Sequence, residues 1–217
     1  MIKVENIEKS YNSESVLKKV SLEFKRGDFV SVMGESGSGK STLLSIMGGF
    51  LAPDKGTVYW DGTDISKLND KELARWRSTK LGFVFQSYKL IPTLNVRDNM
   101  LLTATLGGKL DKDTLSYVDS LTERLKLKDM LSKYPSQLSG GQCQRVAIIR
   151  ALAYKPSVII LDEPTGALDS RMEETVMRLI SEVNSREGTT VIQVTHSEKV
   201  AAYANKTIRL CDGEITL

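Results

Sequence analysis

The segment GESGSGKST, residues 34–42, constrains the fold of this chain more than any other feature. It follows the apolar run DFVSVM (28–33), which has the composition of a strand, and it leads into TLLSIMGG (42–49), which has helical spacing. A glycine-rich turn between a strand and a helix presents backbone NH groups and the positive end of the helix dipole to an anion. The pattern therefore predicts a phosphate-binding strand, turn and helix of an α/β fold.

Each residue type in this turn suits a nucleoside triphosphate. Glycines let the backbone approach the phosphates without side-chain clashes. Lys40 supplies a charge between the β- and γ-phosphates, and the Ser41 hydroxyl is placed for Mg²⁺. The residues predicted to bind the nucleotide here are Gly34, Ser36, Gly37, Ser38, Gly39, Lys40, Ser41 and Thr42.

Further apolar runs predict the rest of a sheet. They are LGFVF (81–85), SVIIL (157–161), TTVIQVT (189–195) and KTIRL (206–210). Several lack a clean alternation of apolar and polar residues, which is typical of strands covered on both faces. A helix is predicted after Asp169, which can cap it, and before Gly188, because Val176, Leu179, Ile180 and Val183 follow helical spacing.

Two regions differ from this α/β core. The segments 1–11, 15–27 and 56–62 have the pattern of antiparallel strands and turns. From residue 95 to residue 153 no strand is evident, and Leu115, Val118, Leu121 and Leu125 fall at helical spacing. We predict one domain over residues 1–217, in which segments 1–86 and 153–217 form a β subdomain and the core, and segment 87–152 forms an inserted helical subdomain.

A second candidate site element is the acidic end of VIILDEPTGALD (158–169). Ligands bind at the carboxyl ends of strands in open α/β sheets, where Asp162 and Glu163 are expected. Because neighbouring residues on a strand point to opposite sides, we expect separate roles, with Asp162 holding Mg²⁺ and Glu163 polarising the attacking water. His196, the only histidine, ends the run TTVIQVTH and is a further candidate.

Composition excludes several other classes of protein. The 30 Lys and Arg against 27 Asp and Glu leave a formal charge of +3 with the two signs interspersed, so we expect no nucleic-acid partner. No run approaches the roughly 18 apolar residues of a membrane span, which predicts a soluble, cytosolic chain. Cys143 and Cys211 form no metal-binding pattern and are expected to be free thiols.

Short motifs follow one another along the chain: Tyr11, GESGSGKST, Gln86 in FVFQS, LSGGQ (138–142), VIILDE, GALDS (166–170) and His196. In this order they resemble the adenine-stacking aromatic, Walker A, Q-loop, signature, Walker B, D-loop and switch histidine of the ATP-binding cassette (ABC) transporter nucleotide-binding subunits. The resemblance covers nearly the whole chain. It implies the ABC ATPase fold, a P-loop NTPase with a RecA-like core, an N-terminal antiparallel β subdomain and an inserted α-helical subdomain.

The resemblance also implies how the chain uses ATP and Mg²⁺. Two copies would pair head to tail, so that each ATP lies between the Walker A motif of one copy and the signature of the other. Glu163 would be the general base, His196 and Lys40 would contact the γ-phosphate, and Gln86 would link the metal to the helical subdomain. The implied metal residues are Ser41, Gln86 and Asp162, and the further ATP-contacting residues are Tyr11, Ser139, Gly140, Gly141, Gln142 and Asp169.

Within the family, FVFQSYKLIPTLNVRDNM, YPSQLSGGQ and DEPTGALDS look most like the subfamily that serves lipoprotein release, macrolide efflux and antimicrobial-peptide export. This implies a transmembrane permease, contacted through Ser87–Met100, and a position on the inner face of the cell membrane. The apolar residues of that segment equally suit packing inside the helical subdomain. Two departures are Cys143 after the signature, for which we have no functional account, and THS in place of a histidine–aspartate pair.

Three other classes of function remain to be weighed. An ATPase that moves a membrane signalling or cell-wall regulator without transport would differ only in its partner. A soluble ABC ATPase of DNA repair or translation would have a second cassette, a long coiled-coil insertion or a basic patch, none of which the sequence contains. A small-molecule kinase would not explain the signature and the D-loop.

Overall fold

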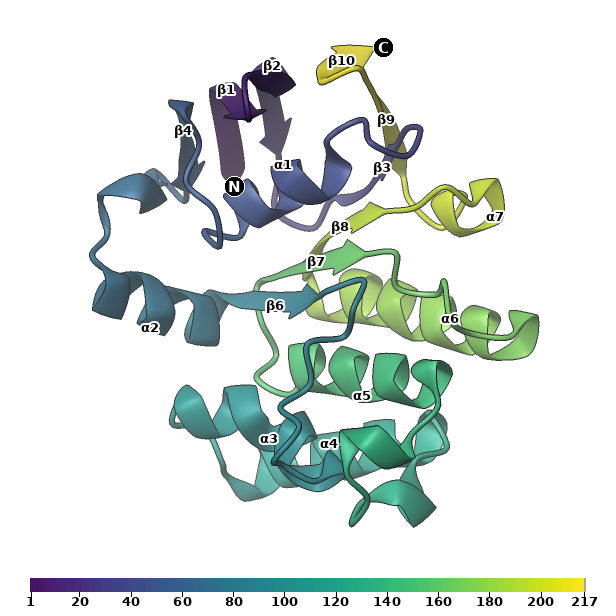
Figure 1. Cartoon of the computed structure of the whole chain (residues 1–217). Helices are drawn as coiled ribbons and strands as arrows, with labels where there is room; N and C mark the ends of the chain where they lie inside the picture. Colours follow the sequence, from purple (N-terminus) through teal and green to yellow (C-terminus); the bar gives the residue numbers. More distant parts are fainter. Residues whose placement is uncertain (217) are drawn as a thin grey trace.

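Two β-sheets and the helices around them make up residues 1–216, the part of the chain that this computed structural model describes (Figure 1). The strands are β1 (Ile2–Tyr11), β2 (Glu14–Phe24), β3 (Phe29–Met33), β4 (Lys55–Trp60), β5 (Thr63–Asp64), β6 (Leu81–Val84), β7 (Val158–Asp162), β8 (Thr190–Val194), β9 (Lys206–Cys211) and β10 (Glu214–Thr216). The α-helices are α1 (Lys40–Met47), α2 (Asp70–Lys80), α3 (Val96–Leu106), α4 (Lys112–Arg124), α5 (Gly140–Leu152), α6 (Ser170–Glu187) and α7 (Glu198–Ala201). Short 3-10 turns lie at Ile65–Lys67, Lys128–Met130 and Pro135–Gln137. Within residues 1–216, no helix has both the length and the apolar character needed to cross a bilayer.

The larger sheet has the strand order β10-β9-β3-β8-β7-β6, with β9, β3, β8, β7 and β6 parallel and β10 antiparallel at the edge. Every residue of β3, β7 and β8 is buried, as expected for strands covered on both faces. All the strands predicted for the core are present within one residue at either end. The parallel order brings the carboxyl ends of β3, β7 and β8 to one edge of the sheet.

The smaller sheet has the order β2-β1-β4-β5 and is antiparallel throughout, as predicted for the N-terminal segments. Its apolar side chains pack with α1 in one cluster on one face of the larger sheet. The opposite face carries α5 and α6, with α3 and α4 beyond them (Figure 1). Strand alternation divides the two clusters, since Val158 and Ile160 belong to the first and Ile159 and Leu161 to the second.

One helix, α2, was not predicted from the apolar pattern. None of its residues is fully buried, and only Leu73 and Trp76 pack against the core, so its apolar face is too short for a periodicity search to find. The residues that start the helix are nonetheless visible in the sequence, because Asn69 caps it and forms a capping box with Glu72.

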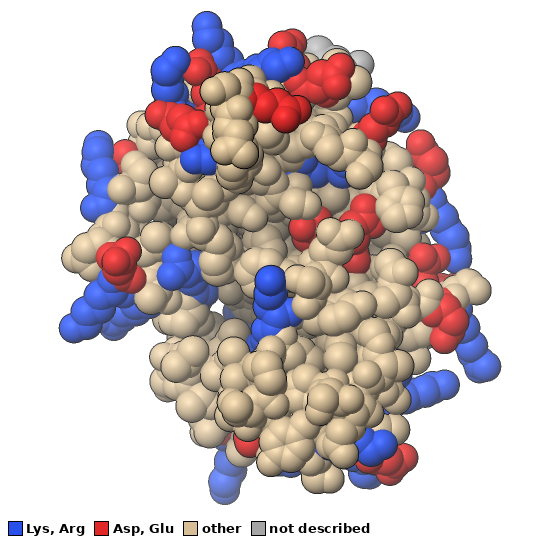
Figure 2. All heavy atoms as spheres, in the orientation of Figure 1, with Lys and Arg blue, Asp and Glu red and all other residues tan. Residues whose placement is uncertain are grey.

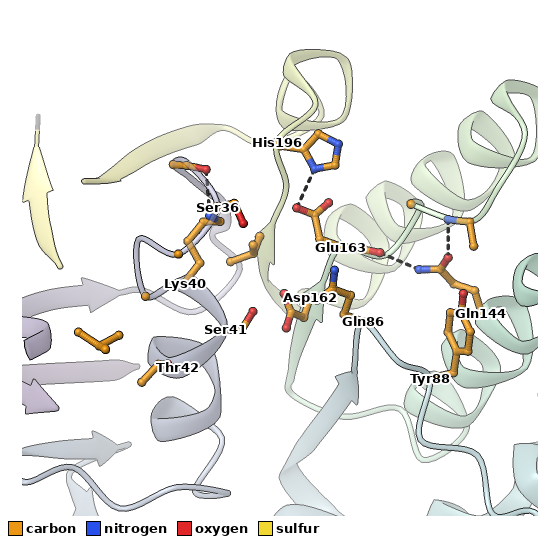
Figure 3. Close-up of a pocket in the computed structure, with 17 residues that line it drawn as sticks. Ser36, Lys40, Ser41, Thr42, Gln86, Tyr88, Gln144, Asp162, Glu163 and His196 are labelled. Atoms are coloured by element: carbon orange, nitrogen blue, oxygen red, sulfur yellow. Dashed lines mark hydrogen bonds and ion pairs between the residues drawn. The ribbon is translucent and has the colours of Figure 1, made fainter. Parts of the chain in front are cut away.

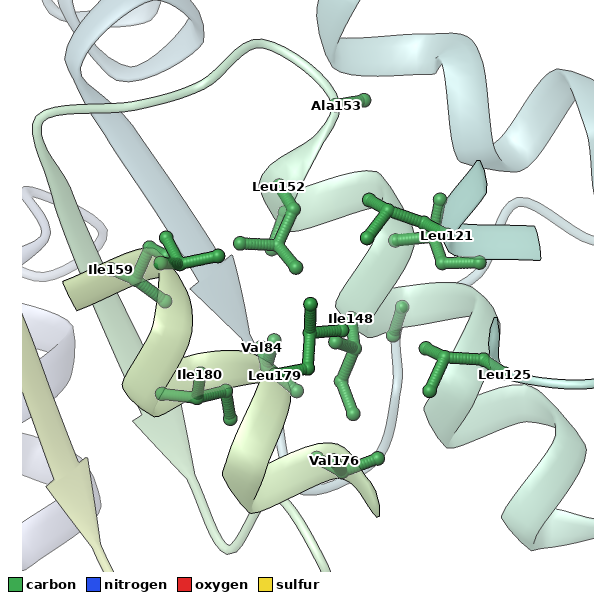
Figure 4. Packing of buried hydrophobic residues seen from close by; sticks show 14 of the residues in the cluster. Val84, Leu121, Leu125, Ile148, Leu152, Ala153, Ile159, Val176, Leu179 and Ile180 are labelled. Carbon is green, nitrogen blue, oxygen red and sulfur yellow. The ribbon is translucent and has the colours of Figure 1, made fainter. Parts of the chain in front are cut away.

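Helices without strands fill residues 85–157, a segment that the structure describes in full. Figure 4 shows that their core is continuous with that of the sheet. Leu121 and Leu125 of α4 share a cluster with Ile148 of α5, Val84 of β6 and Leu179 of α6. Because α5 packs on the sheet as well as on α3 and α4, the limits 87–152 of a helical subdomain stay a prediction.

The shared core predicts that a cavity in α5 weakens the whole chain at once. Ile148 is 1% exposed, and Ile148→Ala should lower the unfolding free energy by about 2–5 kcal/mol. For a chain of this size, that is a fall in the melting temperature of roughly 5–15 °C. Calorimetry should record one transition. Leu106→Ala, at a position 70% exposed on α3, is the matched control and should change little. Two separate transitions in the Ile148→Ala variant would contradict a shared core.

Candidate functional site

A cavity of about 610 Å³ opens where the carboxyl ends of β3, β7 and β8 meet. The space-filling view shows this face hollowed at mid-height, with acidic side chains on one side of the hollow and basic side chains both below it and around the outline (Figure 2). The lining residues come from segments far apart in the sequence (Figure 3). They are Val16, Gly34, Ser36, Gly37, Gly39, Lys40, Ser41, Thr42, Gln86, Tyr88, Gln144, Asp162, Glu163, Gly166, Ala167, Val194 and His196.

The phosphate loop bends sharply between β3 and α1. Gly39 caps α1 with a φ of 98°, and a Cβ on it would lie 2.8 Å from the Val16 carbonyl oxygen, so only glycine fits there. Lys40 folds back over the loop, where its ammonium donates to the carbonyl oxygens of Gly34 at 2.9 Å and Glu35 at 2.5 Å. The single positive charge of the loop thus lies at the N-terminus of α1, where the helix dipole also favours an anion.

Asp162 ends β7 and is 7% exposed. Burial raises the pKa of its carboxyl, the Ser41 hydroxyl opposes that rise, and the charge of Glu163 adds to it. Among the described residues, its Oδ1 atom is buried without a hydrogen-bond partner. A buried, unpaired carboxylate oxygen beside a serine hydroxyl suits a hard divalent cation such as Mg²⁺, which takes oxygen ligands.

No group of three or more His, Cys, Asp and Glu side chains that could hold a metal occurs in residues 1–216. A cation at Asp162 would therefore need hydroxyl, amide, water or phosphate oxygens to complete its shell. This is the usual state of Mg²⁺ beside a nucleotide, since Mg²⁺ keeps several waters and shares the substrate phosphates. Ser41 and Gln86 line the same cavity as Asp162 and carry such oxygens.

Glu163 and His196 meet across the cavity, with His196 Nδ1 2.9 Å from Glu163 Oε1. The Glu163 side chain is 16% exposed, whereas that of His196 is 76% exposed. Glu163 has a φ of 49°, so the chain leaves the extended conformation directly after Asp162. The expected alternation does not reach Glu163 because β7 ends one residue earlier, and the two carboxylates line the same cavity.

The remaining predicted site residues lie outside this cavity. They are Tyr11, Ser38, Ser139, Gly140, Gly141, Gln142 and Asp169. Ser139 caps α5 and forms a capping box with Gln142, so the signature motif is an exposed helix N-terminus. Asp169 caps α6 by accepting from the backbone of Met172 at 2.9 Å. Tyr11 is 47% exposed at the end of β1, with the Lys9 ammonium 5.8 Å from its ring centre.

Several lining residues were not predicted as site residues: Val16, Tyr88, Gln144, Gly166, Ala167 and Val194. Tyr88 was predicted only as part of Ser87–Met100, the segment expected to contact a permease. Val16 belongs to β2 of the other sheet, and no local pattern indicates that it reaches the phosphate loop. Gln144 is 1% exposed, and a polar side chain buried that fully on a helix needs hydrogen-bond partners. Its burial, once known, is the signal that marks it as a candidate site residue.

Cys143 and Cys211 are free thiols, as predicted. Cys143 is half-buried on α5, where its thiol donates to the Pro135 carbonyl oxygen at 3.8 Å. Burial raises the pKa of this thiol, which disfavours the reactive thiolate.

Comparison with known proteins agrees with these features. The family described as "ABC transporter" matches residues 17–166. The lipoprotein-releasing system ATP-binding protein LolD of Bacteroides fragilis is 41% identical over 215 residues, which are 99% of this chain and 100% of that protein. The macrolide export ATP-binding/permease protein MacB of Campylobacter jejuni is 42% identical over 99% of this chain, which spans 33% of that longer protein.

A solved structure is similar over the whole chain. The dimeric, post-hydrolysis structure of the ATP-binding cassette MJ0796 bound to ADP and Pi has a TM-score of 0.94 and 41% identity, covering 100% of this chain and 97% of that one. The fold is thus that of an ABC ATPase, as the sequence predicted. The chain therefore belongs to the ABC transporter family and is an ATP-hydrolysing cassette of that family.

Proposed function

We propose that this chain powers a membrane permease by closing and opening a head-to-tail dimer on ATP, at the inner face of the cell membrane. The observation that carries the proposal is the single cavity where the phosphate loop faces Asp162, Glu163 and His196. Such a cavity offers a phosphate cradle, a cation ligand and a base within one site.

We assign the chemistry to four side chains. Glu163 is the general base that takes a proton from the attacking water, and the His196 imidazole beside it contacts that water and the γ-phosphate. Their 2.9 Å contact supports a shared task. Lys40 stabilises charge on the β- and γ-phosphates, and Gln86 lies where the loop after β6 borders the same cavity.

We assign Ser41, Gln86 and Asp162 to Mg²⁺. When bound, Mg²⁺ would neutralise phosphate charge that develops during transfer. Asp162 is suited to hold it because its buried Oδ1 atom has no hydrogen-bond partner and would gain an oppositely charged one. The adenine is assigned to Tyr11, whose ring is exposed at the end of β1.

The second half of each ATP site is assigned to the exposed N-terminus of α5 in the partner copy. Ser139, Gly140, Gly141 and Gln142 would present a hydroxyl, backbone NH groups and a helix dipole to the γ-phosphate, and Asp169 would reach across the dimer. In this chain those residues lie outside the cavity, which supports a role towards a second copy. The dimeric state of MJ0796, bound to ADP and Pi, supports pairing with a second copy.

The permease is assigned to the segment Ser87–Met100. Tyr88 and Leu90 pack against the core cluster, whereas Ile91 is 39% exposed and Pro92 is exposed, so only part of the segment is free for a partner. We assign a lipoprotein, a peptide or a drug as the transported or extracted molecule, and the names of LolD and MacB favour the lipoprotein and the drug. The same names favour transport over a purely regulatory partner.

Two buried side chains, one of them within Ser87–Met100 itself, hold the first residues of this segment, which we call the docking segment. The Arg150 guanidinium on α5 donates to the carbonyl oxygens of Tyr88 at 2.6 Å and Lys89 at 2.7 Å. Tyr88 and Lys89 have φ values of 61° and 47°, a conformation that is uncommon outside glycine. Asn99 on α3 donates to the Ile91 carbonyl and accepts from its NH. A permease that moves the segment would thereby move α5 and the signature motif.

Removing the base tests the ATPase assignment. Glu163→Gln should lower ATP hydrolysis about 10²- to 10⁴-fold, because a positioned base typically contributes that much, while ATP binding persists. Gel filtration should record a dimer of this variant with ATP and a monomer without it. Lys40→Ala is the contrast, since it should lose both the dimer and turnover. Hydrolysis by Glu163→Gln at the parent rate would rule out this role.

Asp162→Asn should raise the stability of the nucleotide-free chain and abolish its ATP hydrolysis. Its raised pKa means that the ionised form is disfavoured in the folded chain, so the carboxylate costs stability above that pKa and the cost fades as pH falls through it. The melting temperature without nucleotide should rise by roughly 2–6 °C near pH 8, and by less as the pH approaches about 4. Mg²⁺-dependent hydrolysis should be lost. Asp212→Asn, at an exposed turn, is the control, and an equal or larger rise there would contradict the assignment.

Arg150→Ala should loosen the docking segment. Without the guanidinium, the two left-handed residues lose the hydrogen bonds that hold their carbonyls, so trypsin should cleave after Lys89 several-fold faster. Arg145→Ala removes another α5 arginine, one that donates to the Leu125 carbonyl, and should leave that cleavage near the parent rate. Equal cleavage in all three proteins would show that Arg150 does not hold the segment.

A further inference from the structure

Gln144 joins three parts of the site that the sequence keeps apart (Figure 3). Its Nε2 atom donates to the Glu163 carbonyl oxygen at 2.7 Å, and its Oε1 atom accepts from the Ala167 NH at 3.1 Å. The side chain starts on α5, two residues beyond the signature, and is 1% exposed. One amide therefore connects the signature helix, the end of β7 and the start of the D-loop.

The backbone of Glu163 is held on both sides. Its NH donates to the Val194 carbonyl of β8 at 3.1 Å, and its carbonyl accepts from Gln144. Between these two bonds Glu163 has a φ of 49°, which costs about 1 kcal/mol or more for a residue with a Cβ. Such a conformation persists only where its surroundings hold it. Gln144 supplies the hydrogen bond from the α5 side.

The α5 N-terminus also lies close to the D-loop. A Cβ on Gly141 would lie 2.8 Å from the Ala167 carbonyl oxygen, so the signature glycine and the D-loop backbone are in direct contact. Gln144 binds the NH of that same Ala167. A shift of α5 towards or away from the sheet would therefore pull on the peptide that follows Glu163 as well as on the D-loop.

We propose that Gln144 is a positioning residue that couples the orientation of Glu163 to the signature helix, so that engagement of the partner's ATP by α5 sets the base of the chain's own site. This inference rests on the proposed function of Glu163. Both polar groups of Gln144 are occupied by backbone partners, so it acts through Glu163 and the D-loop and not through a bond of its own to the nucleotide. A displacement of a reacting group by about 1 Å can cost roughly 100-fold in rate.

Two substitutions separate positioning from packing. Gln144→Met keeps the length of the side chain and removes both hydrogen bonds. Gln144→Glu keeps the acceptor for the Ala167 NH but places a carboxylate oxygen against the Glu163 carbonyl. Turnover at saturating ATP should fall roughly 10- to 100-fold in both, and at least as far in Gln144→Glu, while the KM for ATP should change by less than about threefold.

The matched control is Gln193→Met. Gln193 is fully buried on β8 and donates to Ser31 Oγ and to the Val200 carbonyl oxygen. By strand alternation it faces away from the cavity-lining Val194. Losing this amide should lower the melting temperature and leave turnover within about twofold. A fall in turnover as large as that of Gln144→Met would mean that buried amides support activity only through stability.

The dimer assay separates this inference from the proposed function. In the Glu163→Gln background, Gln144→Met should still form the ATP-dependent dimer, because the ATP-contacting residues are intact. If the parent chain did not hydrolyse ATP, or if Glu163→Gln formed no ATP-dependent dimer, the proposed function itself would fail. If both were observed and the Gln144 variants matched the parent's turnover, or lost only ATP affinity, the positioning role would be overturned. Should Gln144→Met melt below the assay temperature, Gln144→Glu decides the outcome alone.

Discussion

The parallel pairing of β3, β8 and β7 is the constraint on which the site depends. In register, Val32 pairs with Val194 and Val194 with Asp162, so the three strands end at one level. The phosphate loop, the acidic residues and His196 each lie at one of these strand ends. The sheet therefore brings them together although they are far apart in the sequence. A shift of one residue in either pairing would turn the paired side chains to the other face of the sheet and separate the loop from Asp162.

The same edge concentrates the unfavourable terms of the fold. Asp162 is buried with an unpaired oxygen, and Glu163 adopts a left-handed conformation beside it. Both cost free energy in the folded chain, and under the proposed function a cation and a polyphosphate in the cavity would offset the cost at Asp162. The apolar clusters on the two faces of the sheet supply the stability against which these costs are set. The faces of the sheet thus stabilise the fold, and the edge carries the candidate site residues.

Much of this arrangement was predictable from local sequence, and the failures have physical causes. Apolar runs located the core strands because strands buried on both faces must be apolar. Helix α2 was not predicted because only Leu73 and Trp76, both partly buried, pack against the core. Strand alternation failed at Glu163 because β7 ends at Asp162. Val16 and Gln144 were missed as site residues because their contacts depend on how β2 and α5 pack, which no spacing rule encodes.

Helix α5 contacts both the candidate site and the segment that follows Gln86. Its N-terminus is exposed, Gln144 donates to the carbonyl oxygen of Glu163, and Arg150 holds the segment after Gln86. Its apolar residues pack on the sheet, and Ile148 joins the cluster shared with α4 and α6, so the helix can move only if that packing shifts with it. Helix α5 is thus hydrogen-bonded to the Glu163 peptide at one point and to the Tyr88 and Lys89 carbonyl oxygens at another, which links the positions of these two segments. Under the proposed function, a small movement of α5 relative to β7 would be enough to couple a permease to the ATP site.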